Sequence, residues 1–388
     1  MTPSPAYGTH SAFEAEIYFF LQKANIPHPL QEEAYQANTF PFQTWKHLAN
    51  QGLLQRFATT PTAALPYKDI ALCGYVMTRH HQSLGLTMAW VGQLLKCHFL
   101  RSLNCRDSAY IKNILNGDSL CALAISEPSA GAHPKHLNCT AVRLGSNYIL
   151  NGEKAFVSHG PYADRFIVLA ITEQTQGRKH FSAFLVPAQS EGLQLMPPQP
   201  VNGLRPSSHC NIVFTNCKIS ADTLIGTPGH AFDEISLPMR SLEDGLMLAP
   251  IAGAMQTQLD HLARIDRARS NTSRNKSFDS NKLGELLSLT ESAKELGIIA
   301  ASKLDQHKDT PDLTPLIIGF RSLVEQVQTT LLEWHDEYPS LRELAHDIQL
   351  LSNTGRQATA ARTASLTDRF LDEQRKQDQA TEHFKQQL

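Results

Sequence analysis

Two short segments, residues 125–131 and 151–158, carry hydroxyl and aromatic side chains at spacings that suggest one ligand site. The hydroxyl of Ser126 can donate a hydrogen bond to a carbonyl oxygen. Phe156 offers a flat apolar surface, and Ser158 lies two residues later, on the same face of a strand. By themselves, Ser126 would most often belong to a turn and Phe156 to a core. A ligand-binding role therefore depends on what the two segments resemble together.

Together the two segments resemble the flavin-binding β-domain of the acyl-CoA dehydrogenase family. The resemblance extends over nearly the whole chain and is strongest over residues 123–253. It implies that the flavin ring of FAD lies between the β-domain and the C-terminal helices, with Ser126 at its pyrimidine edge and Ser158 near its N5. The cofactor contacts that it implies in this region are Leu123, Ile125, Ser126, Gly131, Phe156 and Ser158.

The chain departs from the family pattern at three places in these segments. Ser126 replaces the usual Thr and keeps the hydroxyl, whereas Phe156 replaces the usual Trp and loses the indole N–H donor. Ala132 and His133 stand where the family commonly has Ser-Asp. One hydroxyl contact to the cofactor or to CoA is therefore lost.

Two further cofactor contacts are implied in the C-terminal helices. Arg269 falls where an Arg-x-x-Phe-Gly motif of the family reaches the FAD of a neighbouring subunit, and Gln349 matches a Gln-x-x-Gly-Gly motif along the adenosine half of FAD. The glycines of both motifs are missing, although they would allow close backbone approach. A solvated Arg and a surface Gln remain the alternatives. If both residues complete a neighbour's site, the chain forms a homodimer or homotetramer.

The reaction of the family requires a carboxylate that removes the proton next to a thioester carbonyl. Most members carry it in a Glu-Gly-Thr or Glu-Gly-Ser turn near the C-terminus, which this chain lacks. The late Glu373 and Glu382 lie among Lys, Arg and Gln, as on a solvated helix. In a minority, including isovaleryl-CoA and long-chain dehydrogenases, the base lies on the first long helix of the C-terminal domain. Counting back ten residues from Gly253 gives Glu243 at that position.

Three functions remain open. The first is FAD-dependent α,β-dehydrogenation of an acyl-CoA in lipid metabolism, with Glu243 as base and an electron-transfer flavoprotein or oxygen as acceptor. The second is a flavin oxidase or monooxygenase for a substrate without CoA, which the lost Ser-Asp pair and the altered adenosine motifs favour and which would also suit FMN. The third is a non-catalytic relative. Asp244 and Ser241 replace a usual Arg and Asp, so CoA is less firmly implied than the flavin.

The hydrophobic spacing predicts an α+β protein with three domains. Residues 1–122 have apolar side chains at helical intervals, residues 123–230 form short β-rich runs of an antiparallel domain, and residues 231–388 return to the pattern of a helical bundle. Asn151 and Gly152 form the pair of residues that most strongly signals a tight hairpin, so we expect a turn there.

Composition excludes several classes of partner. The 35 basic and 37 acidic residues nearly balance, so no overall field favours nucleic acid or an anionic membrane. The seven cysteines are scattered and never form a Cys-x-x-Cys pair, which argues against disulfides and a metal site. Neither a signal peptide nor an apolar run of the roughly 20 residues that span a bilayer occurs. We expect a soluble, cytoplasmic protein that binds a small molecule.

Overall fold

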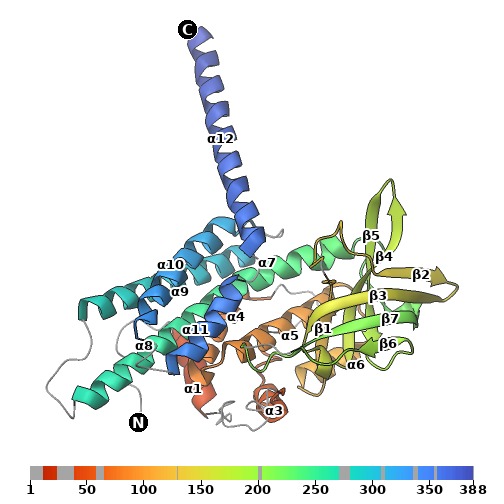
Figure 1. The fold of residues 1–388 in the computed structure, drawn as a ribbon, viewed down its shortest axis with the longest axis horizontal. Coiled ribbons are helices and arrows are strands. Elements are labelled where there is room, and N and C mark those ends of the chain that lie inside the picture. The colour runs from red at the N-terminus through yellow and green to blue at the C-terminus, as the bar shows by residue number, and fades with distance from the viewer. Residues whose placement is uncertain are drawn as a thin grey trace.

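The computed structural model describes residues 12–23, 39–57, 65–128, 130–199, 203–270, 280–306, 311–334, 340–353 and 356–387. Helices come first, a sheet follows, and further helices end the chain (Figure 1). This order confirms the predicted α+β architecture. The N-terminal helices are α1 (Ala12–Lys23), α3 (Phe42–Asn50), α4 (Tyr67–His81), α5 (Leu84–Ser102) and α6 (Ser108–Leu115).

Helix α5 joins the helical part to the sheet. It is apolar around most of its circumference, and a helix of that kind is buried on all sides. Ser83 caps its start by accepting a hydrogen bond from the N–H of Leu86 at 3.2 Å. Farther along, the side-chain amide of Gln93 donates to the carbonyl of Cys121 at 2.8 Å and accepts from its N–H at 3.1 Å. The first strand is thereby fixed against α5.

The middle of the chain folds into one eight-stranded sheet. Its order is β6-β7-β3-β2-β4-β5-β8, and β1 pairs with β4. Most pairs are antiparallel as predicted, but β1–β4 and β2–β4 are parallel, so the sheet is mixed. The strands are β1 (Cys121–Ala124), β2 (Thr140–Leu144), β3 (Asn147–Ser158), β4 (Arg165–Thr175), β5 (Arg178–Pro187), β6 (Leu193–Leu195), β7 (His209–Ser220) and β8 (Leu224–Ile225).

The predicted hairpin at Asn151 and Gly152 is wrong. Strand β3 runs through both residues, and the chain turns earlier, at Gly145, which has a φ of 61°. Gly152 serves another purpose, because a Cβ at this residue would lie 2.7 Å from the Cα of Cys139. The pairing with β7 shifts register between Leu150 and Gly152. Gly152 therefore permits a bulge and a close backbone approach rather than a turn.

The C-terminal helices pack on the N-terminal ones. Gly253 lets one C-terminal helix approach α4 closely, because a Cβ there would lie 2.7 Å from the backbone oxygen of Tyr75. Among the described residues no helix is both long and apolar enough to cross a bilayer. Figure 1 shows the sheet at one end of the helical body, and α12 projects from the helices. These helices are α7 (Leu237–Leu246), α8 (Leu248–Ser270), α9 (Ser280–Gln306), α10 (Thr314–Leu332), α11 (Ser340–Asn353) and α12 (Arg356–Gln387).

Candidate functional site

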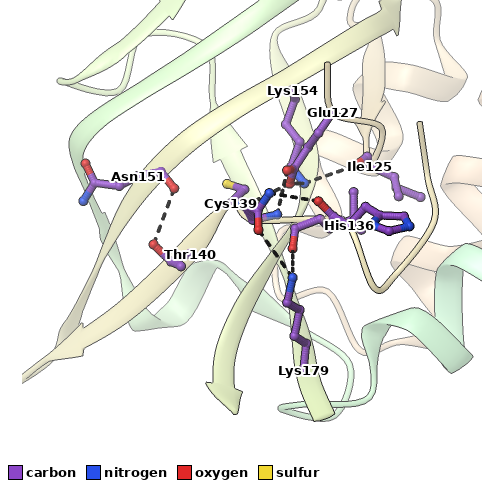
Figure 2. Close-up of polar contacts among 10 residues, drawn as sticks. Ile125, Glu127, His136, Cys139, Thr140, Asn151, Lys154 and Lys179 are labelled. Carbon is purple, nitrogen blue, oxygen red and sulfur yellow. Dashed lines mark hydrogen bonds and ion pairs between the residues drawn. The ribbon is translucent and has the colours of Figure 1, made fainter. Parts of the chain in front are cut away.

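The two motif segments lie against each other in the sheet. The N–H of Ala155 donates to the carbonyl of Ser126 at 2.8 Å. Next to it, the ammonium of Lys154 donates to the carbonyl of Ile125 at 3.0 Å and pairs with the carboxylate of Glu127 at 2.9 Å (Figure 2). Segments that are separated in sequence are thus joined by one backbone bond and one buried ion pair.

The carboxylate of Glu127 is fully engaged. Besides Lys154 it accepts hydrogen bonds from the N–H groups of Asn138 at 2.6 Å and Cys139 at 2.9 Å. Its backbone closes a turn, since its N–H donates to the carbonyl of Gly131 at 2.9 Å and Gly131 donates back at 3.1 Å. Gly131 has a φ of 54°, which favours glycine even though the surrounding space is open. A buried pair with this many hydrogen bonds can offset its desolvation.

Sequence reasoning missed both Glu127 and Lys154. Lys154 is 0% exposed, and Tyr148 and Leu150, at even spacing before it on β3, are also buried. A lysine at an inward position of an alternating strand must find an internal counter-charge, because an unpaired buried ammonium is costly. That alternation was the available signal.

Phe156 is exposed in an uncommon backbone conformation. It has a φ of 55° and 63% of its surface is accessible. The register between β3 and β7 slips between Lys154 and Val157, so Phe156 lies in a bulge. Bulges often re-aim a side chain near a site, and a non-glycine residue at positive φ is strained unless its surroundings hold it there. The flat ring is thus presented on the surface of the sheet.

Ser158 ends β3 directly opposite His209, the first residue of β7. Its Oγ lies 2.9 Å from Nε2 of His209. The following residue, His159, has a φ of 60°, and its N–H donates to the carbonyl of Ser208 at 2.7 Å. Burial, the charge of Lys96 and His209 together lower the pKa of His159 to about 3, so this imidazole is neutral near pH 7.

The other predicted flavin contacts lie along the same short stretch. Leu123 is half-buried and pairs with Ile167 in β1–β4. Ile125 is buried, and Ser126 is half-buried at the junction with β3. The structure therefore brings Leu123, Ile125 and Ser126 to the same part of the sheet as Phe156 and Ser158, and their contact with a flavin stays a prediction.

Glu243 lies on α7, and its surroundings raise the pKa of its carboxyl. Burial is the main cause, Lys96 opposes it, and Asp244 adds to it. Much of the Glu243 side chain is nevertheless accessible. The side chain is thus accessible although its carboxyl lies among protein groups that include the buried Lys96. A carboxylate with a raised pKa holds a proton more readily than an ordinary one.

Lys96 is coupled electrostatically both to Glu243 and to groups beside the motif segments. It lies in the middle of α5 and is 6% exposed, and Gly92 one turn earlier leaves room for its ammonium, since a Cβ at Gly92 would lie 3.1 Å from Nζ. No hydrogen bond or ion pair of Lys96 occurs within the described part of the chain. Burial lowers its pKa, whereas Glu243 and Cys121 of β1 raise it. Lys96 thus interacts electrostatically with α7, with β1 and with His159 beside Ser158.

Arg269 and Gln349 are not gathered at this site. Arg269 is in the last turn of α8, about 30 Å along that helix at ~1.5 Å per residue, and its side chain lies outside the described residues. Gln349 is exposed on α11. Two positions away, Asp347 points inward and accepts a hydrogen bond from the N–H of Leu204 at 2.6 Å. Neither cofactor role is decided by these positions. The described residues contain no cluster of three or more metal-ligating side chains.

Comparisons with known proteins find similarity over the sheet and over most of the chain. The family model of the acyl-CoA dehydrogenase middle domain matches residues 122–217. A mitochondrial isovaleryl-CoA dehydrogenase of Solanum tuberosum is 25% identical over 353 residues, which cover 87% of this chain and 84% of that protein. Among solved structures, the prolyl acyl carrier protein oxidase AnaB superposes with a TM-score of 0.77 at 22% identity, covering 92% of this chain and 99% of AnaB. The FAD complex of PigA gives 0.76 at 20%, covering 93% and 100%.

Proposed function

The chain belongs to the acyl-CoA dehydrogenase family, and on that premise we propose that it is an FAD-dependent oxidoreductase that removes hydrogen across the Cα–Cβ bond of an acyl thioester. The single observation that carries the proposal is Glu243, an accessible carboxylate whose pKa is raised by its protein surroundings. Glu243 lies on α7, the first α-helix after the sheet, close to where the resemblance to the isovaleryl-CoA type implies the base.

The residues on the sheet fit the ring part of FAD. The exposed ring of Phe156 offers a flat apolar face, and the half-buried hydroxyls of Ser126 and Ser158 offer hydrogen bonds at its side. FAD bound here would supply the hydride acceptor. The adenosine half would rely on Arg269 and Gln349 of another copy, which is why a homodimer or homotetramer is part of the proposal.

Glu243 would take the proton from the carbon next to the thioester carbonyl. Burial alone would hold the carboxyl protonated to a higher pH, and the nearby positive charge of Lys96 counters this effect. The pKa of Glu243 is raised overall, so this carboxylate holds the proton that it removes more firmly than an ordinary one.

Two features favour an oxidase as a second candidate function. AnaB, by its name, acts on a prolyl group held by an acyl carrier protein. In this chain Asp244, next to the base, pairs with Arg362 of α12 at 3.1 Å, where the family usually has an arginine. A thioester on a carrier protein, with oxygen as acceptor, would suit this altered surrounding. A cytoplasmic location remains part of either version.

Anaerobic flavin reduction tests the proposal. We expect the purified protein to be yellow, to release FAD on denaturation, and to lose its absorption near 450 nm, as bound flavins do, when isovaleryl-CoA or butyryl-CoA is added without oxygen. Bleaching by a carrier-bound acyl group alone, followed by rapid reoxidation in air, would favour the oxidase. A colourless protein that takes up no FAD would overturn both.

A further inference from the structure

His209 holds Ser158 through a rigid pairing of two strands. The two residues lie opposite each other at the ends of β3 and β7, and Val157 pairs with Cys210 beside them. On the other side the N–H of His159 donates to the carbonyl of Ser208 at 2.7 Å. The 2.9 Å contact between Ser158 Oγ and His209 Nε2 is therefore fixed by backbone on both flanks.

The surroundings of His209 indicate which ring nitrogen carries the proton. Burial lowers the pKa of His209, so the ring is neutral at pH 7 and has a single N–H. Within the described part of the chain Nδ1 is enclosed and has no hydrogen-bond partner. A proton on Nδ1 would be a buried donor without an acceptor, which proteins rarely tolerate, whereas an unused lone pair costs less. The proton therefore belongs on Nε2, which donates to Ser158 Oγ.

This assignment determines what the hydroxyl of Ser158 can do. With His209 donating to its oxygen, the hydroxyl proton of Ser158 points away from His209. The exposed Phe156 lies two residues before, in the bulge that precedes Val157. Were the proton on Nδ1, Ser158 would instead donate to His209 and could only accept from a ligand.

We propose that His209 is a positioning residue that orients the Ser158 hydroxyl as a hydrogen-bond donor towards the ring nitrogen of the flavin that receives the hydride. The inference rests on the proposed flavin site and adds a residue outside both motif segments. An oxidised flavin has an acceptor at this nitrogen, and a reduced flavin has an N–H there. A hydroxyl fixed as a donor stabilises the oxidised form, so His209 lowers the reduction potential.

The test is the reduction potential of the bound flavin, measured against a reference dye with a chemical reductant and without any thioester. His209→Leu frees the hydroxyl to rotate, and the ratio of oxidised to reduced flavin at a given potential should fall by roughly 2- to 12-fold, which is about 10–30 mV upward for a two-electron couple. His209→Gln retains an N–H donor near the position of Nε2 and should restore the value of the parent. His180→Leu, a half-buried histidine on β5, serves as the matched control and should not move it.

A double variant separates positioning from general damage. In a Ser158→Ala background, His209→Leu should produce no further shift, because the hydroxyl that it orients is gone. Equal potentials in His209→Leu and the parent, or an undiminished shift in the Ser158→Ala background, would overturn the inference. If the parent holds FAD but no thioester reduces it, the proposed reaction fails while this measurement still decides the role of His209.

Discussion

Two lysine–glutamate pairs, Lys154 with Glu127 and Lys96 with Glu243, differ in how far their hydrogen-bonding capacity is used. In the sheet, Lys154 and Glu127 touch at 2.9 Å, and Glu127 also accepts two backbone hydrogen bonds. Between α5 and α7, Lys96 and Glu243 affect each other's pKa, but the described residues contain no ion pair between them. A saturated pair holds two segments together. An unsaturated pair leaves a carboxylate that can accept a proton.

Removing the proton acceptor of the second pair should have the largest effect. Glu243→Gln keeps the shape of the side chain but cannot act as a base, and such losses typically cost about 10²–10⁴-fold in rate. Stopped-flow reduction of the flavin by an acyl thioester should slow by that order, while FAD content and thermal stability remain as in the parent. Glu295→Gln, an exposed glutamate on α9, is the control and should reduce at the parent rate. Parent-like reduction by Glu243→Gln would place the base elsewhere.

Breaking the first pair should instead affect folding. Lys154→Met leaves the buried carboxylate of Glu127 without its counter-charge, and breaking a buried pair in this way costs about 3–5 kcal/mol. Urea unfolding should show that loss. The double variant Lys154→Met with Glu127→Leu should lose less than the sum of the two single changes, because no charge is then stranded. A single variant as stable as the parent would mean that the ion pair does not hold the motif segments together.

The contrast also explains what the sequence could reveal. The order of helices and strands followed from hydrophobic spacing, and a local motif is why Ser126, Phe156 and Ser158 could be proposed as flavin contacts, which stay predictions. Lys96 was overlooked because a single lysine in an apolar helix does not reveal which distant carboxylate it faces. The Asn151–Gly152 turn failed because the close contact of Gly152 with Cys139 is made only in the folded sheet.

Lys96→Met tests whether the charge of Lys96 affects the pKa of Glu243 without direct contact. The positive charge of Lys96 favours the ionised form of Glu243, so its removal raises the pKa of Glu243 further. A base is active only when ionised, and its activity is lost as the pH falls through its pKa. The acid limb of the pH profile of flavin reduction should therefore move to higher pH in Lys96→Met. Lys96→Arg keeps the charge and should move it less, whereas an unmoved limb in Lys96→Met would separate the two residues functionally.

The smallest expected effect belongs to Ser158, a neutral hydroxyl that takes part in neither pair. Ser158→Val suits a strand and removes the hydroxyl with its hydrogen bond, which is worth about 0.5–1.5 kcal/mol. The dissociation constant of FAD, followed by fluorescence, should rise by roughly 2- to 12-fold at that energy. Ser158→Thr restores the hydroxyl and should bind FAD as the parent does. If Ser158→Val retains the parent affinity and spectrum while Glu243→Gln still slows reduction, the base is correctly identified and the flavin contact on β3 is not. That result would move the ring contact from Ser158 to Ser126, whose backbone is tied to the saturated pair.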